Sequence, residues 1–239
     1  MAGIAAYGAY VPYYRLQRAA IGAALGSGGG KGTRAVASFD EDATSMGVEA
    51  ARIAMKAANG IAAQAVFFAT STPPYLDKTN AAAIHAALGM PAATGAYDLI
   101  GSPRSAVAAQ RMAGTSPAPA LTVFADVRTG LPGGADERDG GDAAVAFLFT
   151  GTMYDGQAIA EIVGRGSATN EFLDRWRVPG EDASHVWEER FGEHAYVPLA
   201  EIAINDALKM AGVTPSELDH VLVSGLHGRA VRRVAGSIG

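Results

Sequence analysis

The chain has 239 residues and no cysteine, and 49% of its residues are hydrophobic. Because disulfides, zinc–thiolate sites and cysteine nucleophiles all require a thiol, the composition excludes them. The formal net charge is −5, and the basic residues are scattered apart from a short cluster of Arg229, Arg232 and Arg233, which argues against a nucleic-acid groove.

The sequence also lacks the features of a membrane or secreted protein. Its first residues, MAGIAAYGAYVPYYR, contain no basic stretch followed by a long apolar one. No uncharged apolar run approaches the roughly 18 residues that a membrane span needs. A globular protein without a membrane span, located in the cytoplasm, is therefore the default expectation.

Apolar runs and helical patterns alternate along the first part of the chain. Residues 3–10 are small or apolar and end at Val11-Pro12, which predicts a buried strand. Acidic residues at 40–42 precede an alanine-rich pattern through Met55, as expected for a helix. The run AVFFA at 65–69 ends in the turn-rich STPPY and predicts a core strand.

The same alternation continues up to residue 149. A helix is expected at 80–88 and a strand at 94–99, followed by a sharp turn and a second helix that ends at Gly114. Two further apolar strands are expected at 120–125 and 143–149. This order of elements predicts an α/β fold with buried sheets.

The character of the chain changes after residue 160. Residues 161–198 contain both tryptophans and many charges with weak periodicity, and we interpret them as an insertion or cap between a first unit, 1–160, and a second, 199–239. In the second unit we expect a helix at 199–211, a turn, a strand at 221–223 and a last helix from Gly228. We therefore expect part of a longer protein, or one whose remaining core comes from elsewhere.

Six segments in this order resemble a known family. They are GAYVPYYRL, DEDATSMGVEAARIAM, FFATSTPPYL, AYDLIGSPRSAVAA, DVRTGLPGGADERDGGDAAVAFLF and ALKMAGVTPSELDHVLVSG. Together they resemble hydroxymethylglutaryl-CoA synthases, especially the archaeal and bacterial kind, and more distantly 3-oxoacyl carrier-protein synthases of the third type. The resemblance implies a thiolase fold of layered αβαβα architecture with an active site between two similar halves, usually in a homodimer. Here the first half looks complete and the second truncated.

The resemblance also implies where catalytic groups belong. The family uses a thiolate at a helix N-terminus to take an acyl group from a CoA thioester. In AYDLIGSPRSAVAA that slot falls at Pro103, which has no nucleophilic atom but suits a first helical turn. We interpret the neighbouring Ser102 as a helix cap rather than as a replacement nucleophile. Arg104 could attract a CoA phosphate or a carboxylate, although a solvated residue or an interface ion pair is the favoured interpretation.

The two other reactive slots are altered as well. The general acid/base glutamate of the synthases corresponds to Ser71. Their histidine, which polarises the thioester carbonyl, corresponds to Ser224, with His227 three residues further on. His227 is either a hydrogen-bonded structural histidine at a strand end or a donor to the thioester carbonyl. We interpret Asp126, Arg128, Asp139 and Asp142 as residues that order loops.

Other patterns do not support a cofactor or metal site. GSGGGKGT fails as a phosphate loop because Lys31 is followed by glycine instead of serine or threonine. His185 and His194, with Glu188, Glu189 and Glu193 between them, fit no zinc spacing. We therefore expect no metal and no covalent cofactor, with a CoA thioester as the possible ligand.

Two functions fit this pattern. The first is a thiolase-fold subunit without condensing activity that forms a homodimer, or a complex with a catalytic thiolase and an OB-fold, zinc-ribbon protein. The second is an enzyme acting on CoA thioesters without a thiolate, such as a retro-aldolase or lyase on a β-hydroxyacyl-CoA, with His227 and Tyr75 as candidate groups. An ordinary synthase is disfavoured, because acetyl-enzyme formation needs a residue that this chain lacks.

Overall fold

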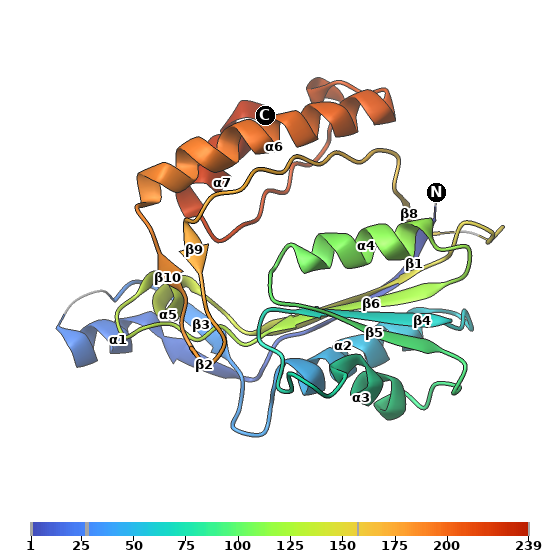
Figure 1. Ribbon diagram of the computed structural model, residues 1–239, viewed down its shortest axis with the longest axis horizontal. Coiled ribbons are helices and arrows are strands. Elements are labelled where there is room, and N and C mark those ends of the chain that lie inside the picture. The colour runs from blue at the N-terminus through green and yellow to red at the C-terminus, as the bar shows by residue number, and fades with distance from the viewer. Residues whose placement is uncertain (1, 27–28, 157, 239) are drawn as a thin grey trace. The chain divides into compact units, whose positions relative to one another are not determined.

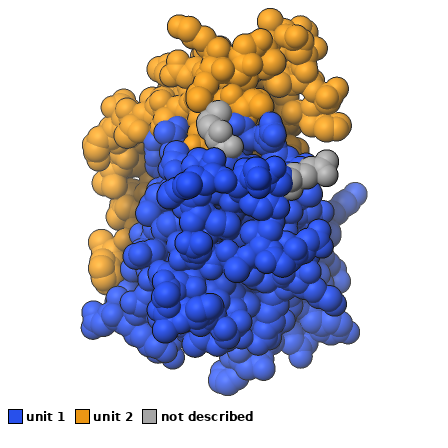
Figure 2. All heavy atoms as spheres, turned by 90° about the vertical axis from the view of Figure 1, so that its right-hand side faces the viewer, with its two compact units in different colours: residues 1–162 blue, residues 163–239 orange. Residues whose placement is uncertain are grey.

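The computed structural model describes residues 2–26, 29–156 and 158–238, and the chain divides into two compact units (Figure 1). The first unit is Met1–Ile162 and the second is Val163–Gly239; Figure 2 colours them separately. The division into 1–160, an inserted cap at 161–198 and 199–239 stays a prediction.

The first unit has the alternating elements that the sequence predicts. Its strands are β1 (Gly3–Tyr10), β2 (Tyr14–Gln17), β3 (Thr33–Val36), β4 (Ala65–Thr70), β5 (Gly95–Ile100), β6 (Ala120–Asp126), β7 (Ala143–Phe149) and β8 (Ala160–Glu161). Its helices are α1 (Arg18–Leu25), α2 (Ala43–Ala57), α3 (Asn80–Ala87), α4 (Ser105–Thr115) and α5 (Ala135–Asp139). All five strands and all three helices expected in this unit are confirmed, with small shifts at their ends.

Six of these strands form a mixed sheet with the order β5-β4-β6-β7-β1-β8. Strands β4, β5 and β6 are parallel, whereas β7 runs antiparallel to β6 and to β1. The C-terminal ends of β1, β4, β5 and β6 therefore lie at the same end of the sheet as the start of β7. Loops at this end can bring side chains from distant parts of the sequence together.

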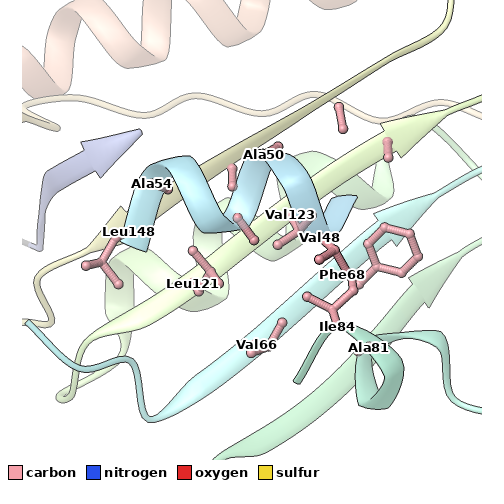
Figure 3. Close-up of a cluster of buried hydrophobic side chains, with 14 of the residues drawn as sticks. Val48, Ala50, Ala54, Val66, Phe68, Ala81, Ile84, Leu121, Val123 and Leu148 are labelled. Atoms are coloured by element: carbon pink, nitrogen blue, oxygen red, sulfur yellow. The ribbon is translucent and has the colours of Figure 1, made fainter. Parts of the chain in front are cut away.

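Helix α2 packs against one face of the sheet through a buried side that consists mostly of small residues, together with Met46 and Val48. Asp42 and Ser45 form a capping box at its start, in which the Ser45 N–H donates to Asp42 Oδ1 over 2.7 Å. Figure 3 shows Ala50 and Ala54 among the core side chains of the strands, together with residues of α3. Gly8 of β1 permits this approach, because an added Cβ there would collide with the Ala50 carbonyl oxygen.

Helix α4 covers the opposite face of the sheet (Figure 1). Its buried residues Ala109 and Ala113 pack with Phe67 of β4 and Phe149 of β7. The first unit is thus a sheet between helical layers, with two hydrophobic clusters at its faces. Burial on both faces explains why the strands are nearly continuous apolar runs.

Five short elements of the first unit are absent from the sequence prediction, one of them the two-residue strand β8. Strands β2 and β3 pair with each other in a separate two-stranded sheet, and α1 connects them through the glycine-rich loop. Helix α5 lies within the loop that had been expected to be irregular. Elements this short leave little periodicity in a sequence, because a short helix has only one or two turns and a short strand has only a few alternating residues.

The second unit contains two long helices and little sheet. Its elements are β9 (Arg175–Trp176), β10 (His185–Val186), α6 (Glu189–Ala211), the 3-10 turn η1 (Pro215–Glu217) and α7 (Gly228–Ile238). The predicted turn after Val213 is confirmed, with Thr214 and Glu217 forming a capping box. Val197 of α6 packs with Ala230 and Val234 of α7 in a small core.

Helix α6 begins earlier than the sequence predicts and continues through Pro198. A proline removes one helical hydrogen bond and normally ends or kinks a helix. Here the neighbouring Val197 is buried against α7, and this packing favours a continuous helix across the proline. The expected start at residue 199 was therefore wrong, because the pattern before it is irregular.

The strand expected at residues 221–223 does not form. The segment has no regular secondary structure, and Leu222 is 96% exposed. An extended segment becomes a strand only where a neighbour completes its backbone hydrogen bonds, and the described residues pair no strand with it. The apolar run VLV has high β propensity, but propensity alone does not supply a neighbouring strand.

Candidate functional site

A cavity of about 390 Å³ lies in the first unit at the end of the sheet where the parallel strands finish. Its walls come from Ala9 and Val11, residues 69–71, the segment Ser102, Pro103 and Ala106, residues 124–126, and residues 143–145. Two of the predicted site residues, Ser71 and Pro103, thus line one cavity although they belong to different connections of the sheet. The parallel arrangement of β4 and β5 brings them together.

Pro103 lies in the turn that leads from β5 into α4. The turn begins at Gly101, whose φ of 102° favours glycine. The Ser102 hydroxyl accepts a hydrogen bond from the Arg104 N–H over 3.2 Å, and the Pro103 carbonyl accepts one from the Ala106 N–H over 3.1 Å. Ser102 was expected to cap α4, but the helix begins at Ser105 with Arg104 as its N-cap and has no side-chain capping bond, so the Ser102 contact orders the turn before the helix. Pro103 therefore lies two residues before the helix, and its side chain contains only carbon atoms.

Asp126, at the end of β6, accepts hydrogen bonds from the end of β4 and from the turn that follows it. Its Oδ1 atom accepts hydrogen bonds from the Ser71 N–H over 2.7 Å, from the Ser71 hydroxyl over 3.0 Å and from the Thr70 hydroxyl over 3.0 Å. Its Oδ2 atom lies 3.8 Å from Nη2 of Arg128. The predicted loop-ordering role of Asp126 is confirmed, and the structure adds that this carboxylate lines the cavity beside Ser71.

The loop after Asp126 is fixed by a buried ion pair that the sequence did not indicate. Arg34 of β3 donates to Asp142 over 3.1 Å, and both side chains are almost fully buried. Arg34 also donates to the carbonyl oxygens of Arg128, Asp136 and Glu137. Asp142 accepts in addition from the backbone N–H groups of Ala37 and Arg128. The ordering role expected for Asp142 is confirmed.

Asp139 is bound more loosely than Asp142 and lies nearer the surface. Its carboxylate pairs with Arg138 over 2.7 Å and lies 3.8 Å from Arg18. These neighbours lower the pKa of Asp139, mainly through the hydrogen bond from Arg138. Asp139 belongs to the outer part of the same loop and is not part of the cavity wall.

The cavity wall is predominantly apolar. Its polar side chains are those of Thr70, Ser71, Ser102 and Asp126, and the remaining lining residues are apolar. Arg104 is exposed in the turn before α4 and is not among the lining residues. Tyr75 is half exposed, with the Lys78 ammonium 4.8 Å from the centre of its ring, and it does not line the cavity either. The roles suggested for Arg104 and Tyr75 stay predictions.

The other two predicted site residues belong to the second unit. Ser224 is exposed in the irregular segment before α7. His227 lies at the start of α7 and not at a strand end, and its Nδ1 atom accepts a hydrogen bond from the Ala230 N–H over 3.1 Å. His227 therefore has the structural hydrogen bond expected of it, while its role toward a thioester stays a prediction.

An aromatic cluster surrounds His227 within the second unit. The ring of Tyr196 lies 6.0 Å from that of His227, and Gly192 leaves room for the imidazole against α6. The Tyr196 hydroxyl donates to Asp174 over 3.1 Å. The pKa of Tyr196 is raised to about 12. Burial of the hydroxyl is the larger cause, and the hydrogen bond to the negatively charged Asp174 is the second. Tyr196 is therefore a neutral hydrogen-bond donor at physiological pH.

Across the described residues, no group of three or more histidine, cysteine, aspartate or glutamate side chains is placed to hold a metal ion. His185 instead pairs with Glu181 over 2.9 Å and stacks on Trp176. The side chain of Glu189 and residues 27–28 of the glycine-rich loop lie outside the described residues.

None of the helices in the described part of the chain is long and apolar enough to cross a membrane.

Solved structures with this fold include condensing enzymes. The chain superposes on the 3-oxoacyl-(acyl carrier protein) synthase III of Pseudomonas aeruginosa with a TM-score of 0.81, at 21% identity, covering 99% of this chain and 79% of that one. It superposes on an HMG-CoA synthase complexed with CoA with a TM-score of 0.74, at 18% identity, covering 89% of this chain and 57% of that one. These similarities confirm the predicted thiolase fold.

The curated relatives give the family. The chain is 31% identical to the hydroxymethylglutaryl-CoA synthase of Aeropyrum pernix over 251 residues, covering 100% of this chain and 69% of that protein. It is also 31% identical to that of Pyrococcus furiosus over 228 residues, covering 92% and 65%. The chain thus spans about two thirds of the length of these relatives. No protein-family model matches it. On the identity and the coverage of these relatives, the chain belongs to the hydroxymethylglutaryl-CoA synthase family.

Proposed function

We propose that this chain is an acyl-CoA-binding member of the family that lacks thiolate-dependent condensation and acts as a non-catalytic subunit of an acyltransferase-type complex. One observation carries the proposal: Pro103 lines the cavity at the approach to α4, and the chain contains no cysteine. Acyl transfer from a CoA thioester to an enzyme needs a nucleophilic atom at that place. Proline preserves the turn and supplies none.

A CoA thioester is the ligand that the site supports best. The cavity is concave and mostly apolar with a few polar groups, as small-molecule sites usually are. A related fold binds CoA, as the HMG-CoA synthase complex shows for that protein. CoA itself would be held without covalent attachment. A cytoplasmic location stays part of the proposal.

Acylation and binding measurements test this function together. Purified protein is incubated with acetyl-CoA and its intact mass is measured, while calorimetry follows binding of the thioester. We expect binding without any gain in mass, and an acetyl adduct on the unmodified protein would overturn the proposal.

The variant Pro103→Cys then checks that residue 103 is the correct slot. A thiol there should become acetylated, because the cavity presents it to the thioester. Ala108→Cys is the matched control, since residue 108 is exposed on the same helix and does not line the cavity. Equal acetylation of both variants would mean that position 103 has no special access to the ligand.

A partner chain is the second part of the proposal. Strand β5 is an edge of the six-stranded sheet, and its residues Tyr97 and Ile100 are 52% and 40% exposed. An open edge with apolar side chains favours pairing with another strand. A second copy of this chain would extend the sheet across β5, and a catalytic thiolase or an OB-fold, zinc-ribbon protein would complete a larger complex.

One observation favours a second candidate function. The Asp126 carboxylate lines the cavity beside Ser71 and could accept the β-hydroxyl proton of a β-hydroxyacyl-CoA. Loss of that proton forms a carbonyl as the Cα–Cβ bond breaks, and the electron pair passes to the thioester as an enolate, which is then protonated. Incubation with 3-hydroxybutyryl-CoA, whose acyl group is uncharged, should release acetyl-CoA and acetaldehyde if this is correct.

Two variants separate the groups proposed for this cleavage. Asp126→Asn should abolish it if the carboxylate is the base, and His227→Ala should slow it if the imidazole also acts on the substrate. Cleavage unaffected by both changes would assign the reaction to a contaminant or to another site. No release of acetyl-CoA by the unmodified protein would leave the binding function as the better description.

A further inference from the structure

We infer that the cavity selects an uncharged, apolar acyl group and rejects an acyl group that ends in a carboxylate. This inference rests on the proposed function, because it takes the cavity as the place where the acyl part of a CoA thioester binds. It deepens that function by naming the chemical class of the acyl group.

The chemistry of the cavity wall favours an apolar acyl group. Small or apolar side chains from β1, α4, β6 and β7 form most of it, among them Ala9, Ala106, Phe124 and Ala144. Such a surface offers no hydrogen-bond partner to a polar chain end. Each methylene that leaves water against it should tighten binding by about fourfold.

The charge of the wall disfavours an anionic ligand. Among the described residues that line the cavity, Asp126 has the only ionisable side chain, so this part of the wall contains a negative group and no positive one. A ligand carboxylate would lose its hydration in the cavity and would also be repelled by Asp126. Both effects act in the same direction and exclude an anionic chain end.

The carboxylate of Asp126 is already occupied by hydrogen-bond donors of the protein. Its Oδ1 atom accepts from the Ser71 N–H and from the hydroxyls of Ser71 and Thr70. Arg128 lies 3.8 Å from the Oδ2 atom and does not line the cavity. The hydroxyls of Thr70 and Ser71, which could otherwise hold a ligand carboxylate, therefore point to Asp126. Ser102, whose hydroxyl also belongs to the wall, accepts a hydrogen bond from the Arg104 N–H. This contrasts with the hydroxymethylglutaryl group in the names of the relatives, which ends in a carboxylate.

The test compares thioesters that differ in one property at a time. Butyryl-CoA and succinyl-CoA have acyl chains of the same length, but the first ends in a methyl group and the second in a carboxylate. Acetyl-, butyryl- and octanoyl-CoA differ only in apolar length, and free CoA provides the baseline. Binding of each to the full chain is measured by calorimetry.

We expect affinity to rise from acetyl- to butyryl- to octanoyl-CoA, and succinyl-CoA to bind no more tightly than CoA. Succinyl-CoA binding as tightly as butyryl-CoA would overturn the inference while leaving acyl-CoA binding intact. Failure of CoA and all its thioesters to bind would instead overturn the proposed function. The two failures are therefore distinguishable.

Two variants locate the selectivity in the cavity. Ala106→Leu should fill it and remove most of the gain from acetyl- to octanoyl-CoA, whereas Ala108→Leu, at an exposed position of the same helix, should not. Asp126→Asn removes the negative charge and should raise the affinity for succinyl-CoA relative to butyryl-CoA. Affinities that Ala106→Leu leaves unchanged would place the acyl chain elsewhere and refute the inference.

Discussion

Asp126 and Arg34 show how single residues position the candidate site from a distance. Asp126 accepts four hydrogen bonds from the end of β4 and the turn after it through one carboxylate oxygen. Arg34 fixes the following loop by donating to Asp142 and to carbonyl oxygens of that loop. A charge with this many fixed partners holds backbone segments in place more strongly than an exposed pair does.

Removal of Asp142 should destabilise the first unit strongly. Asp142→Ala leaves the Arg34 guanidinium buried without its counter-ion and two backbone N–H groups without an acceptor. Breaking a buried pair in this way costs about 3–5 kcal/mol. Urea unfolding measures the change, and Asp77→Ala, at an exposed position, should stay within about 0.5 kcal/mol of the unmodified protein. Similar losses in the two variants would contradict the structural role of the pair.

The Tyr196–Asp174 hydrogen bond predicts how stability depends on alkaline pH. The pKa of Tyr196 is raised from 10.0 to about 12, so folding favours its protonated form. This stabilisation is complete below the unfolded-state pKa and is lost as the pH rises through the folded-state value. Because the residue is 37% exposed, we discount the contribution to about 1 kcal/mol.

The variant Tyr196→Phe isolates this effect. Its unfolding free energy should fall less steeply with pH, between about 10 and about 12, than that of the unmodified protein. Urea midpoints measured across this range give both slopes. Tyr13→Phe, where the residue is 87% exposed, is the control and should leave the slope unchanged. Parallel slopes for Tyr196→Phe and the unmodified protein would contradict the assignment.

At the scale of whole elements, close helix–sheet contact determines the shape of the first unit. Helix α2 packs alanines and Gly47 against the sheet. On the sheet side, Gly8 of β1 has no side chain, so its backbone lies close to the backbone of α2. Small residues on both sides let the backbones approach closely. The alanine-rich pattern that predicted this helix is therefore also the reason for its tight packing.

Gly8→Ala should disturb this contact. The new methyl group would collide with backbone atoms of α2 near Ala50 and Ala54, which cannot move aside as a flexible side chain can. We expect a loss of about 1–3 kcal/mol in the free energy of unfolding. Gly141→Ala is the matched control, because an added Cβ there meets open space. An equal effect of both substitutions, measured by urea unfolding, would show that α2 tolerates the extra volume.

Sequence and structure agree best where elements are long and buried. The strands from β4 to β7 and the helix α2 have strong apolar patterns, and their positions were predicted closely. The site was predicted in part: Ser71 and Pro103 line the cavity, but Asp126 had been given only a loop-ordering role. Its position directly after a strand parallel to β4 was the available signal.

The remaining differences follow from packing that a sequence does not display. The VLV run at 221–223 has the apolar character of a strand, but no described strand pairs with it. Helix α6 crosses Pro198 because Val197 is buried against α7. Arg34 has no sequence pattern at all, since its partners are up to 108 positions away. Long-range pairing decides these cases, and local propensity cannot.

For the molecule as a whole, the open edge at β5 is the surface from which assembly is predicted. Ile100→Lys places a charge on this edge and should shift a dimer toward monomers, because a buried unpaired charge disfavours strand pairing. Sedimentation velocity measures the molecular mass in solution. Leu131→Lys, at another exposed apolar position, is the control and should not change it. A dimer that persists in Ile100→Lys would place the interface elsewhere.

The pairing of β1 with β7 has a consequence for synthesis of the chain. Ile4 is opposite Phe149 and Tyr10 is opposite Ala144, so the first strand finds its main partner only at the end of the first unit. Until the ribosome has made the intervening residues, β1 has no β7 with which to form backbone hydrogen bonds, and the sheet cannot form completely. The nascent chain therefore depends on late translation for its first strand, and apolar β1 is the segment that chaperones would need to protect until then.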